Sequence, residues 1–242
     1  MGHIPFYIPV VFIATTVLTL LLLFKASRYA KIVLAISLLW LGIQAGLGLA
    51  EFYLVTDTIP PRFALAVVPP VLLAIACFTT ARGKAFIDRF DASWLTLLHT
   101  VRVPVEIVLF WLFVQKYVPQ LMTFEGRNLD ILSGITAPVV MYFGYAQRRL
   151  NRNVLLAWNF VCLGLLFNIV IHAMLSAPSS FQQFDFDQPN VGVLYFPFIW
   201  LPSFIVPVVL FSHLVSIRQL IRQGDVVKEK HSFKVEPVKE TV

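Results

Sequence analysis

Residues 94–118 read WLTLLHTVRVPVEIVLFWLFVQKYV. This apolar stretch of about 25 residues is long enough to cross a lipid bilayer as one tilted helix. It nevertheless contains three ionisable residues, His99, Arg102 and Glu106. At about 100° per residue their side chains fall on one face of the helix. Because a charged group at the bilayer centre costs about 2.5–3.5 kcal/mol on insertion scales, we expect this face to line a polar interior.

Arg102 is the residue of this stretch that most needs partners, because a guanidinium does not lose its proton in a protein. Glu106 lies one turn further on and is the expected ion-pair partner. Pro104 has no N–H for the carbonyl of Thr100, so we expect the helix to bend beside Arg102 and to open carbonyls there. A second helix should supply further hydrogen bonds to Arg102.

Residues 31–54 repeat this polar pattern and are the candidates for that second helix. Ser37, Gln44 and Glu51 recur every seven residues and therefore share one helix face. The predicted interior site thus comprises His99, Arg102, Glu106, Ser37 and Gln44. Glu106 would bind a proton or cation, Arg102 would pair with it or anchor an anion, and His99 would relay protons. Two structural alternatives stay open: a sealed Arg102–Glu106 pair, and a helix-packing face around Gln44.

The composition indicates an all-α integral membrane protein. Of the 242 residues, 58% are hydrophobic and 13% are charged, against about 25% charged in soluble domains. Seven apolar segments predict seven transmembrane helices, at residues 6–24, 31–54, 63–80, 94–117, 129–147, 153–175 and 192–215. Two cysteines in apolar runs, Cys77 and Cys162, exclude a disulfide framework.

The distribution of basic residues predicts the orientation of these segments. Most lysines and arginines follow segments one, three, five and seven, whereas Arg62, Lys116 and Arg127 lie in the other connections. The positive-inside rule then places the N-terminus outside and the C-terminus in the cytoplasm. The net charge of +6 therefore reflects topology and does not predict nucleic-acid binding. We expect the lipid bilayer of a bacterial inner (plasma) membrane as the environment.

Two regions flank or interrupt the spans. Residues 82–94 place Phe86, Ile87 and Phe90 on one side and charges on the other, which predicts a short interfacial amphipathic helix before the fourth span. Residues 225–242 are polar and predict a disordered cytoplasmic tail, so that residues 1–224 form the transmembrane domain.

The outer connections predict an acidic mouth that would concentrate cations. Its candidate residues are Glu51, Asp130, His172, Asp185 and Asp187. Phenylalanine and aspartate alternate over residues 184–187. In an extended chain this alternation would put both carboxylates on one side and both phenylalanine rings on the other. His172, Asp185 and Asp187 are the candidates for an outer metal site. Asp130 could instead cap the fifth helix, as could Asn128.

Three functions fit these features. The leading hypothesis is a protein that binds or transports a small solute or cation, coupled to protons. The second is a membrane-embedded, metal-dependent enzyme acting on a lipid or lipid-linked substrate at the outer cluster. The third is a non-catalytic receptor or assembly subunit. The last span has no lysine for a retinal Schiff base, and none of the common catalytic or nucleotide-binding motifs stands in a suitable context. The sequence predicts no particular cofactor or oligomeric state.

Overall fold

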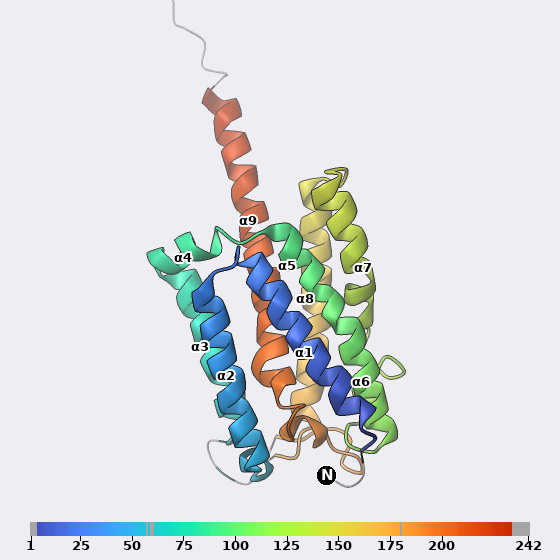
Figure 1. The fold of residues 1–242 in the computed structure, drawn as a ribbon. Coiled ribbons are helices and arrows are strands. Elements are labelled where there is room, and N and C mark those ends of the chain that lie inside the picture. The colour runs from blue at the N-terminus through green and yellow to red at the C-terminus, as the bar shows by residue number, and fades with distance from the viewer. Residues whose placement is uncertain (1–3, 57, 59–60, 180, 234–242) are drawn as a thin grey trace, which may run out of the picture.

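The computed structural model describes residues 4–56, 58, 61–179 and 181–233, and in this part of the chain every regular element is helical. Figure 1 shows the helices as a bundle, with the N-terminus at its lower end. The helices are α1 (Tyr7–Ala26), α2 (Lys31–Leu49), α3 (Ala64–Thr79), α4 (Ala81–Ile87), α5 (Ala92–Leu98), α6 (Arg102–Val114), α7 (Ile131–Met141), α8 (Arg152–Leu175) and α9 (Val206–Phe233). Short 3-10 turns lie at Phe52–Leu54, His99–Val101, Gln120–Met122 and Gly192–Leu194, and π-helical turns at Tyr142–Ala146 and Leu201–Ile205. The all-helical class is confirmed.

Five helical runs in the described residues are long and apolar enough to cross a membrane. They are Tyr7–Ala26, Lys31–Leu49, Ala92–Val114, Arg152–Leu175 and Leu201–Arg222. Helices Ala64–Thr79 and Ala81–Ile87 are also long and apolar enough when they are taken together, but their axes are bent by 96° at the break between them. The remaining apolar helix, Ile131–Ala146, is shorter, because α7 begins well inside the bundle.

The bundle has two ends, which we name after one residue at each. The Asp88 end, uppermost in Figure 1, contains the connections from α1 to α2 and from α3 to α5. It is held by the N–H of Asp91, which donates to the carbonyl of Ala26 at 2.8 Å. The Glu51 end, lowermost in Figure 1, contains the connections that leave α2, α6 and α8.

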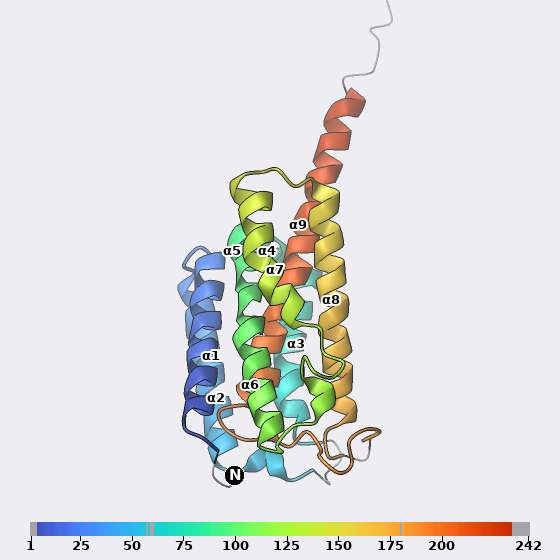
Figure 2. The same ribbon diagram turned by 90° about the vertical axis from the view of Figure 1, so that its right-hand side faces the viewer.

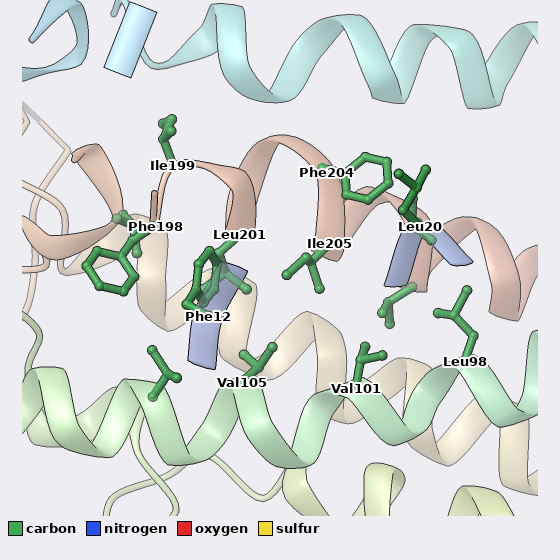
Figure 3. Close-up of a cluster of buried hydrophobic side chains, with 14 of the residues drawn as sticks. Phe12, Leu20, Leu98, Val101, Val105, Phe198, Ile199, Leu201, Phe204 and Ile205 are labelled. Carbon is green, nitrogen blue, oxygen red and sulfur yellow. The ribbon is translucent and has the colours of Figure 1, made fainter. Parts of the chain in front are cut away.

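The core lies where α1, the α5–α6 run and α9 meet. Figure 3 shows four side chains directed into one apolar cluster. They are Phe12 of α1, Leu98 and Val101 of the α5–α6 run, and Ile205 of the π-helical turn that precedes α9. All four side chains are buried. Between helices in lipid, close packing rather than transfer from water holds such a cluster together. The ionisable residues of the α5–α6 run are thus fixed on a rigid element.

Beside Arg102, where the sequence predicts a bend, α-helical hydrogen bonding is interrupted. The 3-10 turn His99–Val101 separates α5 from α6 within one continuous run. Pro207 acts similarly in α9, because it cannot bond the carbonyl of Ser203 four residues earlier. The indole of Trp40 on α2 donates to that carbonyl at 2.8 Å. A side chain of a neighbouring helix thereby satisfies the backbone group that the proline frees.

The predicted amphipathic helix at residues 82–94 is two elements. Helix α4 begins after Thr80, whose hydroxyl accepts from the N–H of Gly83 at 3.0 Å, and it ends at Ile87. Asp91 then caps α5, accepting from the N–H of Ser93 at 2.9 Å. The prediction of one helix was wrong, because Asp91 caps the start of a second helix.

Helix α9 extends to Phe233 and projects beyond the other helices at the Asp88 end (Figure 1). The first part of the predicted tail, up to residue 233, is therefore helical. Residues 234–242 lie outside the described residues, and disorder there stays a prediction.

Candidate functional site

The connection between α6 and α7, residues 115–130, returns into the bundle. Figure 2 shows α7 beginning partway along the bundle, with this irregular segment leading to it between α6 and α8. Thr123 and Asn128 are fully buried, and Asp130 is 5% exposed. Non-helical chain is tolerated at membrane depth only where protein or a polar cavity surrounds it. Accordingly, Asn168 of α8 donates to the carbonyl of Arg127 at 2.9 Å.

Arg102 is the centre of the polar site. Its guanidinium forms an ion pair with Asp130 at 2.7 Å, and both side chains are almost completely buried. It also donates to the carbonyl of Cys162 on α8 at 3.3 Å and lies 2.9 Å from Nε2 of His213 on α9. One residue of α6 therefore joins α7, α8 and α9.

Two histidines stack beside this ion pair. The rings of His99 and His213 lie 3.8 Å apart at an interplanar angle of 18°. Since Arg102 can only donate, Nε2 of His213 accepts, and its protonated Nδ1 donates to the side-chain oxygen of Asn159 at 2.9 Å. His213 is thereby fixed as a neutral imidazole. Both ring nitrogens of His99 are buried without a hydrogen-bond partner among the described residues.

Glu106 lies on the other side of the ion pair. Its Oε1 accepts from the side-chain amide of Asn128 at 2.5 Å, while its Oε2 is buried without a partner among the described residues. The other end of Asn128 accepts from the N–H of Asp130 at 3.0 Å. Asn128 thus links the carboxylate of Glu106 to the backbone of Asp130. The ion pair of Arg102 is formed with Asp130 rather than with the expected Glu106.

The site therefore contains more buried carboxylates than cations. Arg102 neutralises Asp130, which is in direct contact with it. Glu106 is 2% exposed and has an amide as its hydrogen-bonding neighbour. An ionised carboxylate without a cation is costly at such a position. Glu106 must therefore carry a proton or accompany a cation.

The predicted residues of α2 do not join this cluster. Oε1 of Gln44 accepts from the hydroxyl of Tyr53 at 2.6 Å, which is the packing role left open above. Ser37 is buried on the wall of an apolar pocket. Glu51 is exposed at the end of α2, in the left-handed region at φ 55°. Of the five predicted interior residues, His99, Arg102 and Glu106 are brought together with Asp130.

The predicted outer cluster is not assembled as expected. Asp130 belongs to the interior site. His172 Nδ1 lies 2.7 Å from the carbonyl of Asn168, and Asp185 accepts from the hydroxyl of Ser176 at 3.2 Å. Asp185 has φ 52°, so the extended alternation expected for residues 184–187 is wrong. In the part of the chain that the structure describes, no group of three His, Cys, Asp or Glu side chains is placed to hold a metal ion, including His172, Asp185 and Asp187.

A second polar feature lies at the Asp88 end. A pocket of about 920 Å³ is lined by Arg28, Asp88, Asp91, Arg148 and Arg222, among other residues. Partial burial raises the pKa of Asp88, but hydrogen bonds and charges from Arg218 and Arg222 outweigh it, so the pKa lies below its usual value. This carboxylate therefore stays ionised and ties α9 to the end of α4.

A family model described as a domain of unknown function (DUF8737) matches residues 59–221. The chain belongs to the DUF8737 family. Among curated proteins and among solved structures, no match was found. The DUF8737 match includes every side chain of the buried site, from His99 to His213, whereas α1 and α2 precede it. The site is thus contained in the matched part of this DUF8737 protein.

Sequence reasoning missed three contributors to the site: Asn128, Asn159 and His213. Asn128 was interpreted as a helix cap. The available signal was Arg102 itself, since a buried guanidinium requires a carboxylate from some segment. Asp130, at the start of the fifth apolar segment, was one of the acids available for this role.

Proposed function

We propose that this DUF8737 protein is a polytopic membrane protein that transports a small solute or cation, coupled to exchange of a proton at Glu106. Its chain would cross a bacterial plasma membrane seven times, with the N-terminus outside. Two features support this topology: the long apolar helices, and the concentration of basic residues in the connections of the Asp88 end. In the fifth crossing, the 115–130 connection would complete the path that α7 is too short to span.

The observation that carries the proposal is the excess carboxylate. Arg102 is committed to Asp130 by a buried contact, which leaves Glu106 without a cation of its own. A proton neutralises Glu106 in the sealed form described here. Loss of that proton would leave a negative charge beside Asn128, and a cation or a rearrangement of the 115–130 connection would have to compensate it. Proton exchange and movement of the solute would be coupled in this way.

Arg102 and the histidines have supporting roles in this proposal. Arg102 keeps Asp130 ionised, so that Glu106 alone exchanges its proton. His99 has two unpartnered ring nitrogens on the side of Arg102 that faces the Asp88 end, and it would accept or supply protons from that direction. The pocket at the Asp88 end would connect the site with the cytoplasm.

The test is a proton-flux assay in proteoliposomes, with an entrapped pH-sensitive dye and a potassium diffusion potential as the driving force. Glu106→Gln should abolish protein-dependent proton movement, since the amide keeps the acceptor for Asn128 but has no exchangeable charge. Glu125→Gln is the matched control, because Glu125 is an exposed acid of the same connection. Unchanged flux through correctly folded Glu106→Gln protein would refute the proposal.

A further inference from the structure

A second, chemically different pocket lies between α2, α3 and α9. It has a volume of about 340 Å³. Its walls include Ile36 and Trp40 of α2 and Leu73 and Cys77 of α3, and Phe204 and Phe211 form its inner side. Almost all of this lining is aliphatic or aromatic. The pocket is therefore suited to a hydrocarbon chain and not to the ionic cargo of the buried site.

Prolines of α3 and α9 lie in the walls of the pocket. Pro207 of α9 and the pair Pro69–Pro70 of α3 all line it. The π-helical turn Leu201–Ile205 directly precedes Pro207, and Trp40 bonds the carbonyl that this proline frees. The carbonyl of Ser203 is thus satisfied from within the protein. What remains exposed to an occupant is apolar.

The side chains around the pocket indicate whether it opens to lipid or to water. Leu39 of α2 is 68% exposed, and Leu72 of α3 is 57% exposed. Exposed aliphatic side chains on helices of this length and hydropathy face lipid hydrocarbon. A molecule that enters between α2 and α3 would therefore come from the bilayer.

Basic residues lie at the Asp88 end of the same pocket. Ile32 and Phe86 line the pocket at this end. Lys31 directly precedes Ile32 in the sequence. Arg82 lies four residues before Phe86 and therefore on the same face of α4. Neither Lys31 nor Arg82 forms an ion pair within the described residues. An apolar slot with cations at one end is complementary to an anionic lipid.

From this arrangement we infer that the pocket between α2, α3 and α9 binds an acyl chain of a phospholipid with an anionic headgroup, whose phosphate lies beside Lys31 and Arg82. This binding site is separate from the proton site at Glu106. Its occupant would hold α2 and α3 in place against α9 without entering the buried ionic cluster.

Photo-crosslinking with the full chain in nanodiscs tests this inference. The probes are phosphatidylglycerol and phosphatidylcholine that carry a diazirine midway along one acyl chain. Tandem mass spectrometry then locates the label at individual residues. Phosphatidylglycerol should label Trp40 and Leu73 in preference to Leu38 and Leu72, which are exposed on the same helices outside the pocket. The labelling yield with phosphatidylglycerol should exceed that with phosphatidylcholine by about fivefold for each basic residue that contacts the headgroup. Lys31→Gln and Arg82→Gln should each lower this ratio by about fivefold.

A variant pair supplies the control. Ala74→Trp places an indole in the pocket and should reduce labelling, whereas Leu72→Trp on the lipid-facing side of α3 should not. The wild-type labelling pattern needs no variant and decides the matter even if Ala74→Trp folds poorly. Equal labelling of pocket and lipid-facing positions, equal labelling by both lipids, or crosslinks to a second copy of the chain would overturn the inference.

Discussion

The guanidinium of Arg102 donates a 2.7 Å hydrogen bond to the carboxylate of Asp130, and this ion pair joins the first residue of α6 to the residue that precedes α7. The two residues are separated by 28 positions in the chain. The contact therefore fixes where the 115–130 connection ends and at what depth α7 begins. Loss of either charge would leave the other buried without compensation.

Asp130→Asn and Arg102→Gln should each destabilise the protein by about 3–5 kcal/mol, the cost of leaving one member of a buried pair unpaired. The double variant should lose less than the sum of the two. Denaturant unfolding in mild detergent measures all four species of this cycle. Additive losses would show that the two residues are not coupled.

Glu106→Gln should leave the stability close to that of the wild type, because Glu106 has no buried cation to lose. Glu106→Ala should cost about 1–3 kcal/mol, since it removes the oxygen that accepts from Asn128. Thermal unfolding of the two purified variants separates these outcomes. If Glu106→Gln were as unstable as Asp130→Asn, Glu106 would be an ionised partner of Arg102.

Gly134→Ala should destabilise the contact between α7 and α6 by about 1–3 kcal/mol. A β-carbon at Gly134 would lie 2.9 Å from the backbone nitrogen of Val103 and 2.8 Å from Cγ2 of Val103, so the helices would have to separate. Gly164→Ala is the control, because a β-carbon there has nothing within 4 Å, and it should stabilise α8 by up to about 1 kcal/mol. A neutral result at Gly134, measured by the same unfolding assay, would contradict the close packing.

The Asp88 contacts should make stability depend on pH. The pKa of Asp88 is lowered in the folded state, so its contribution is complete above the ordinary aspartate pKa of about 4 and is lost as the pH falls through the folded value. The difference in melting temperature between wild type and Asp88→Asn should therefore be largest at neutral pH and should shrink on acidification. A difference that grew on acidification would mean that the pKa is raised.

The helical segments could be predicted from the sequence because apolar runs of span length are a direct signal. The predicted segment 153–175 differs from α8 by one residue. The interruption of the α-helix beside Arg102 also followed from one residue, because Pro104 cannot bond the carbonyl of Thr100. Local chemistry was sufficient in both cases.

The composition of the site could be predicted only in part. Helix periodicity grouped His99, Arg102 and Glu106, since they share one face of one run. It could not identify Asp130 or Asn128 as their partners, because the 115–130 connection has no periodic pattern from which its depth could be calculated. The pairing of His99 with His213 depends on how α9 lies against α5, and spacing within either helix contains no information about that.

The short α7 also has a consequence for how the protein is made. Its run Ile131–Ala146 would cover roughly 24 Å at 1.5 Å per residue, less than the hydrocarbon core of about 30 Å. Two hydrogen bonds of this region need α8: Arg102 donates to the carbonyl of Cys162, and Asn168 donates to the carbonyl of Arg127. Neither bond can form while only the first seven helices have been synthesised, because Cys162 and Asn168 belong to α8. The 115–130 connection therefore gains its contact with α8 only after that helix has emerged, although Arg102 and Asp130 can pair earlier. The hydrogen bonds that connect α8 with the 115–130 connection and with Arg102 are therefore formed late in synthesis, and those of His213 on α9 follow them.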